Sequence, residues 1–143
     1  KALEIVTMGT LSKMFANLKP STPEKDRIAN EVGLPNQNHL ENWLHGVAVL
    51  RNIAAHHNRL FQRTVPVVPL TAIPLPGKWI DTRSISNQSV YFHLSRMAYL
   101  LQFISPGNRF ALRLNDLFTK YHPTVKFKEV GFPANWRNQP LWR

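Results

Sequence analysis

The chain has 143 residues, enough to bury one hydrophobic core, and its apolar and aromatic content argues against a mainly disordered protein. No apolar run approaches the roughly 20 residues that cross a bilayer, and the absence of cysteine excludes disulfides and thiolate metal sites. Eighteen lysines and arginines against eight acids give a net charge of +10. This excess favours a polyanionic partner, nucleic acid before an anionic membrane. We expect a cytoplasmic protein without membrane association.

Two helices are predicted at the start of the chain. Apolar residues spaced by threes and fours predict an amphipathic helix over residues 2–19, which Pro20 ends. A short second helix should begin with Thr22 as N-cap and Pro23 at its first position, and stop at Gly33.

A long third helix is predicted over residues 38–63. Asn38 followed by Glu41 resembles a capping arrangement at its start. Apolar side chains fall on one side at the helical period, and these should face the core: Leu40, Trp43, Val47, Leu50, Ala54 and Phe61.

The next segment carries Pro66, Pro69, Pro74 and Pro76, which preclude a regular helix and discourage a central strand. Its apolar residues suggest a long connection laid over the surface of the bundle. A helix should restart near Ser86 or Asn87, with a core face of Val90, Leu94, Met97, Ala98 and Leu101. A fifth helix, ended by Pro123, should bury Phe110, Leu114, Leu117 and Phe118.

The C-terminal tail is aromatic, basic and interrupted by proline. Its aromatic side chains have two interpretations, base stacking or anchoring of the tail to the core, and we favour anchoring: Phe127, Phe132, Trp136 and Trp142. The chain shows no internal repeat. The fold class predicted is therefore all-α, a single domain over residues 1–143 made of about five helices, a long Pro-rich connection and an irregular tail.

The sequence "LRNIAAHHNRLFQR", residues 50–63, gathers cations and imidazoles without an acid. On a helix that buries Leu50, the opposite side would carry a polar stripe of Asn52, His56, Arg59 and Arg63, extended by His45 and flanked by Arg51. Ala48 and Ala55 beside the stripe would leave room for a ligand, and His57 would point nearer the core. No Asp or Glu occurs between Asn42 and Ile80. The stripe is either a phosphate-binding surface or a merely basic helix face.

Arg51-Asn52-x-x-x-His56 resembles the R-x4-6-H motif of HEPN domains. Three longer segments, "ALEIVTMGTLSKMFANL", "HLENWLHGVAVLRNIAAHHNRLFQR" and "VGFPANWRNQPLW", resemble the Abi-like family of bacterial abortive-infection proteins, of the AbiD/AbiF type. Because members of this family are usually about twice as long and the chain lacks an initiator Met, we expect it to be the C-terminal part of a longer protein.

The resemblance implies an α-helical HEPN-like bundle that dimerises and cleaves RNA without a metal, as a toxin in phage defence. It further allows for an antitoxin or an inhibitory RNA as a partner. In this interpretation His56 transfers protons, Arg51 binds the phosphate and Asn52 orients either group. A homodimer would bring two such sets into one cleft. Further candidate RNA contacts are Arg59, Arg63, His45 and His57, although a structural role is favoured for His57.

Two other functions remain open at this point. The same stripe could grip RNA without cleaving it, and a structural dimerisation domain is a weaker alternative. The six histidines make no standard zinc spacing and no glycine-rich phosphate loop is present, so we expect neither a metal nor another cofactor.

Overall fold

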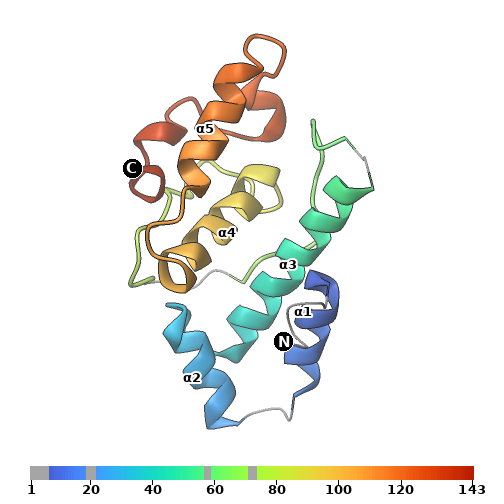
Figure 1. Ribbon diagram of the computed structural model, residues 1–143, viewed down its shortest axis with the longest axis vertical. Coiled ribbons are helices and arrows are strands. Elements are labelled where there is room, and N and C mark those ends of the chain that lie inside the picture. The colour runs from blue at the N-terminus through green and yellow to red at the C-terminus, as the bar shows by residue number, and fades with distance from the viewer. Residues whose placement is uncertain (1–6, 19–21, 57–58, 71–73) are drawn as a thin grey trace.

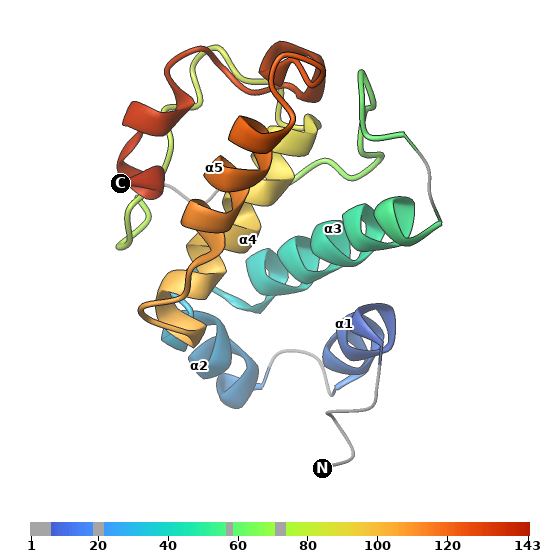
Figure 2. The same cartoon turned by 45° about the horizontal axis from the view of Figure 1, so that its top comes forward.

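A computed structural model describes residues 7–18, 22–56, 59–70 and 74–143, and within them the protein is all-α, as predicted. The α-helices are α1 (Met8–Asn17), α2 (Pro23–Glu31), α3 (Gln37–Ala55), α4 (Val90–Ile104) and α5 (Phe110–Lys120). Three short 3-10 helices follow, η2 (Phe127–Val130), η3 (Trp136–Asn138) and η4 (Pro140–Trp142). Figures 1 and 2 show α4 in the middle, with α5 and the tail on one side and α1 to α3 on the other.

The second helix begins and ends near the predicted residues, whereas the first begins at Met8, six residues later than predicted. Thr7 caps α1 by accepting a hydrogen bond from the Thr10 amide (3.1 Å), and the helix ends before Leu18. Thr22 is the N-cap of α2, and Pro23 takes its first position, where a missing amide proton costs nothing. Gly33 follows α2 with φ of 74°, a left-handed conformation that favours glycine.

The third helix is shorter than predicted. Its N-cap is Asn36 rather than Asn38, with the Asn36 side-chain oxygen accepting from the His39 amide at 3.2 Å. It ends at Ala55 with His56 as C-cap, so the prediction of a helix to residue 63 is wrong. Ala54 and Phe61 are exposed instead of lying on a core face.

Burial of later residues explains this early end. Val65 and Val67 pack with Leu50 of α3 and Val90 of α4 in a small second core. The Val65 amide donates to the Gln88 carbonyl at 2.9 Å. A helix continued to residue 63 would carry these valines away from both contacts, so their burial outweighs the local helical pattern.

The Pro-rich connection lies against α3 and forms no helix in its described residues, as predicted. Alternate side chains of residues 65–70 are buried. The Asn42 side chain donates to the Val68 carbonyl (3.0 Å) and accepts from the Leu70 amide (2.9 Å), while the Trp43 indole donates to the Leu70 carbonyl (2.8 Å). Side chains of α3 thus provide the hydrogen bonds that a sheet would otherwise supply.

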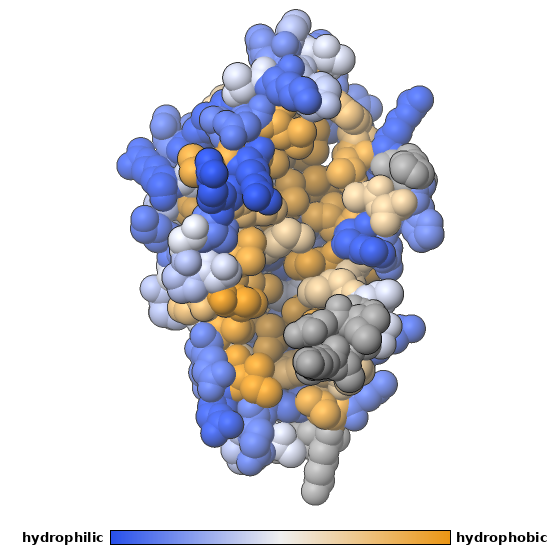
Figure 3. Space-filling view, in the orientation of Figure 1, coloured by the Kyte–Doolittle hydropathy of each residue, from blue (hydrophilic) through white to orange (hydrophobic). Residues whose placement is uncertain are grey.

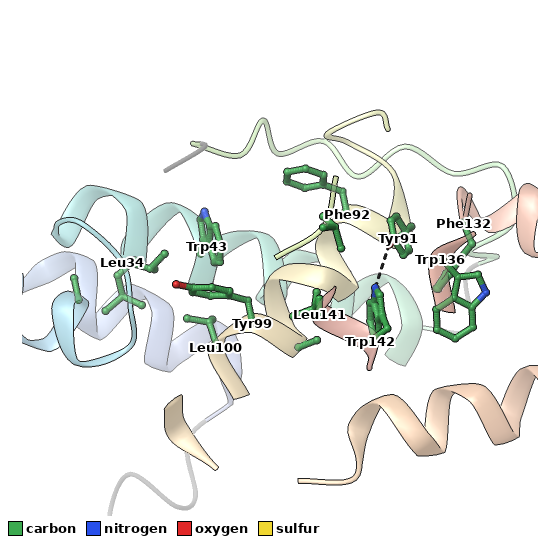
Figure 4. Packing of buried hydrophobic residues seen from close by; sticks show 14 of the residues in the cluster. Leu34, Trp43, Tyr91, Phe92, Tyr99, Leu100, Phe132, Trp136, Leu141 and Trp142 are labelled. Carbon is green, nitrogen blue, oxygen red and sulfur yellow. Dashed lines mark hydrogen bonds between the residues drawn. The ribbon is translucent and has the colours of Figure 1, made fainter. Parts of the chain in front are cut away.

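The main core is built around α4 and is rich in aromatic side chains (Figure 4). At one end Trp43 stacks on Trp79 and meets the edge of Tyr99. At the other end Tyr91 accepts a hydrogen bond from the Trp142 indole at 3.1 Å.

The tail aromatics close this second end of the core. Phe132, Trp136 and Trp142 are all buried, which confirms that they anchor the tail. Buried rings have no free face for a base, so these three side chains are excluded as stacking platforms.

The predicted core faces of α4 and α5 were only partly right. On α4, Val90 and Ala98 are buried as expected, but Leu94, Met97 and Leu101 are half-buried, and the aromatic residues carry the core instead. On α5, Phe118 is buried, whereas Leu117 is 51% exposed. The tail covers α5 from one side only, which leaves part of its apolar face in solvent.

Candidate functional site

The residues of the R-x4-H motif lie on the last turn and a half of α3, and all three are exposed. The Arg51 guanidinium donates to the Asn52 side-chain oxygen at 3.2 Å. The Asn52 carbonyl in turn accepts from the backbone amide of His56 at 3.1 Å, which fixes His56 as the residue that closes the helix. Asn52 therefore links Arg51 to the helix end that carries His56.

At the C-terminal end of α3, an anion would be attracted by the cationic side chains and not by the helix backbone. The C-terminus of a helix carries partial negative charge from its free carbonyl groups. A phosphate here would depend on Arg51, His56 and Arg59, which follows His56 by three residues. All three are exposed, and the sequence between Asn42 and Ile80 contains no acid. Guanidinium groups suit this task because their planar donors match phosphate oxygens.

The stripe predicted along the whole helix is interrupted. At its N-terminal end Glu41 pairs with the buried Lys25 of α2 at 2.5 Å, so this acid belongs to the packing of α2 on α3. Ala48 is buried and offers no open approach, whereas Ala55 is exposed. His45 is exposed, but eleven residues before His56 it lies about 16 Å away along the helix axis.

The remaining predicted contacts lie beyond the helix. Arg59 and Arg63 are exposed in the segment after α3. The prediction that they continue a stripe along the helix is therefore wrong. Arg63 instead lines a hollow of about 220 Å³ together with Lys128 of the C-terminal tail. His57 lies outside the described residues.

A second polar cluster, which the sequence analysis missed, is buried between α3 and α4. Arg96 is fully buried, donates to the Asn42 carbonyl at 2.8 Å and lies 5.3 Å from the centre of the Trp43 ring. Its other terminal nitrogen is 3.4 Å from His93 Nδ1. Burial lowers the pKa of Arg96 to about 9, and burial together with the charge of Arg96 lowers the pKa of His93 to about 4.

Gly46 makes this arrangement possible. A Cβ atom at Gly46 would lie 2.7 Å and 2.8 Å from the terminal nitrogens of Arg96 and 2.9 Å from His93 Nδ1. The sequence signal of such a close contact is a glycine inside a long helix, which costs stability unless a close neighbour requires it. The cluster is sealed from solvent, and its contacts hold α3 against α4.

Within the described ranges no group of three His, Cys, Asp or Glu side chains comes together as a metal site. No helix in the described part of the chain is long and apolar enough to cross a membrane.

A sequence model of the family described as Abi-like protein matches residues 1–62. No curated protein and no solved structure matches the chain. The matched part contains α1, α2, α3 and the Arg51–His56 motif, so the similarity to Abi-like proteins covers the candidate site.

Proposed function

We propose that this chain is a metal-independent endoribonuclease of an abortive-infection system, with a HEPN-type site formed by Arg51, Asn52 and His56. One observation carries the proposal: these three residues are exposed together at the end of α3, inside the part that matches Abi-like proteins. The AbiD/AbiF type, a toxin role in phage defence and a cytoplasmic location belong to the same proposal. A controlling antitoxin or inhibitory RNA would be its partner.

The chemistry needs only the side chains of the site. His56 takes the proton from a ribose 2′-hydroxyl, the 2′-oxygen attacks the adjacent phosphorus, and the bond to the 5′-oxygen breaks. A second acid then protonates the leaving 5′-oxygen, which leaves a 2′,3′-cyclic phosphate and a 5′-hydroxyl. Arg51 holds the phosphate and stabilises the charge that builds up on it, and Asn52 keeps the Arg51 guanidinium in position.

A homodimer would supply the second acid. One His56 per chain serves for one proton transfer, and a two-fold axis beside the end of α3 would bring His56 of another copy into the same cleft. Exposed apolar side chains on α1 and α5 support association: Met14, Leu112 and Leu117. Figure 3 shows apolar surface along the middle of one face, between α3 and the α4–α5 pair, and such patches are typical of protein interfaces.

The test is incubation of the protein with total bacterial RNA in EDTA. We expect fragments ending in 2′,3′-cyclic phosphate from the parent protein, and none from His56→Ala or Arg51→Ala. Arg27→Ala is the matched control, since it removes an exposed arginine of α2 far from the motif in sequence. Fragments of equal yield from the parent and His56→Ala would contradict the assignment of His56.

The alternative is an RNA-binding module without catalysis, favoured by the same exposed cations in an acid-free segment. In that case RNA stays intact with every variant. Arg51→Ala would then lower RNA affinity and reduce its dependence on salt.

A further inference from the structure

Three adjoining hollows run along the C-terminal segment. The first, about 220 Å³, forms where the Gln62 amide donates to the Glu129 carbonyl at 2.6 Å, and it is lined by Arg63 and Lys128. The second, about 660 Å³, shares Lys128 and adds Lys126, Phe127 and His122. The third, about 380 Å³, shares His122 and Phe127 and adds Arg137.

We call this surface the C-terminal groove, defined by Arg63, Lys128, Lys126, His122, Phe127 and Arg137. Figures 1 and 2 both show the segment after α3 approaching the part of the tail that carries η2. The groove therefore starts in the segment that follows the motif helix and continues across the tail.

The groove carries an excess of positive charge. Three of its lysines and arginines, Arg63, Lys126 and Lys128, are exposed. The acid at the groove is Glu129, which is half-buried and uses its backbone carbonyl to hold Gln62. Residues 117–143 contain five lysines and arginines against this one acid. Clustered exposed cations repel one another, and a polyanion relieves that repulsion.

The groove also offers flat surfaces suited to unpaired bases. Phe127 is half-buried and forms part of the floor of the largest hollow. The Arg137 guanidinium lies 4.8 Å from the Phe127 ring centre and 4.7 Å from that of Trp136, and its Nε donates to Asn115 at 2.5 Å. These contacts hold the guanidinium plane in place before any ligand arrives. Single-stranded nucleic acid is bound in this way, with bases on aromatic and guanidinium planes and phosphates on cations.

We propose that the C-terminal groove binds single-stranded RNA, with phosphates along Arg63, Lys128 and Lys126 and bases against Phe127 and Arg137. This rests on the proposed function, because it describes where the substrate strand runs beyond the site at the end of α3. Arg63 follows His56 by seven residues and lines the first hollow of the groove. Paired strands hide the base faces that the apolar floor would contact, so single-stranded RNA is the favoured form.

The test measures binding of a fluorescent single-stranded RNA whose riboses are 2′-O-methylated, so that the attacking hydroxyl is absent and cleavage cannot interfere. Lys126→Ala/Lys128→Ala removes two exposed cations of the groove. Lys13→Ala/Lys78→Ala is the matched control, because it removes the same charge from exposed positions on α1 and the Pro-rich connection. We expect the groove variant to bind about tenfold more weakly, and its slope of log affinity against log salt to fall by about 1.4, or 0.7 for each lost phosphate contact.

Each outcome separates this proposal from the nuclease proposal. Equal weakening by both double variants would overturn the groove, because binding would then follow net charge alone, and cleavage at His56 would still stand. Selective weakening by the groove variant, with no cleavage by the parent protein, would support the groove and overturn the nuclease. Equal affinity for a duplex of the same sequence would overturn single-strand binding.

Discussion

Replacing Gly46 by Ala should destabilise the protein, although the same change in an exposed helix is stabilising. Alanine is favoured over glycine in helices by about 1 kcal/mol. At Gly46, however, the new methyl group would overlap both terminal nitrogens of Arg96 and Nδ1 of His93. The guanidinium would have to leave the Asn42 carbonyl and the Trp43 ring. Because Arg96 is fully buried, the displaced guanidinium would not gain contact with water in exchange.

The magnitude follows from the burial of Arg96. Breaking the contacts of a buried charge costs roughly 3–5 kcal/mol. Subtracting the helical preference of alanine leaves a net loss of about 2–4 kcal/mol. With a urea m-value of about 1–3 kcal/mol per molar, the unfolding midpoint should fall by about 1 M or more. Tryptophan fluorescence is a direct probe, since Trp43 contacts the displaced group.

Gly9→Ala in α1 is the control for this experiment. A Cβ atom there meets Thr7 Oγ1 at 3.8 Å, an ordinary contact, so this variant should be as stable as the parent or gain up to about 1 kcal/mol. Arg96→Met added to Gly46→Ala should recover part of the loss, because it removes the group that collides. The reasoning is refuted if Gly46→Ala is as stable as Gly9→Ala.

Three further predictions use other contacts of the structure. The pKa of His93 falls from 6.5 to about 4 in the folded state, so the unfolded chain binds more protons between these pH values. The contribution of His93 to the free energy of unfolding should be full above pH 6.5 and decline toward pH 4. In urea titrations, His93→Asn should lessen this dependence of stability on pH. Trp142→Phe leaves the buried Tyr91 hydroxyl without its donor and should lower the free energy of unfolding by about 1–3 kcal/mol, with Leu112→Ala on the exposed face of α5 as the comparison. If His56 acts in a homodimer, RNA cleavage per chain should rise with protein concentration across the dissociation range found by sedimentation, and a constant rate would argue for a monomeric enzyme.

The sequence predicts best where local signals decide the structure. Thr22, Pro23 and Gly33 mark both ends of α2 through their own backbone preferences, and the structure agrees. The four prolines of the connection likewise exclude a helix by their chemistry alone. These features need no knowledge of which distant segments meet.

The prediction fails where distant residues decide. The end of α3 depends on residues 64–67 pairing with residues 88–90, which no helical period reveals. The same pairing removes Arg59 and Arg63 from the helix and carries Arg63 to the tail. Arg96 of α4 is buried because Gly46 of α3 leaves a gap for it, and the sequence does not show that these two positions meet.

The candidate site combines both kinds of information. The placement of Arg51, Asn52 and His56 at one helix end follows from their spacing, whereas the surface that continues from them depends on contacts between the segment after α3 and the tail. In the proposed arrangement substrate binding and the chemical step depend on different residues, because Lys126 and Lys128 lie in the C-terminal tail whereas Arg51 and His56 lie at the end of α3. Loss of the lysines should therefore weaken substrate binding and raise KM, since it acts before the bond is broken. Loss of His56 should lower kcat, because proton transfer is needed only in the transition state.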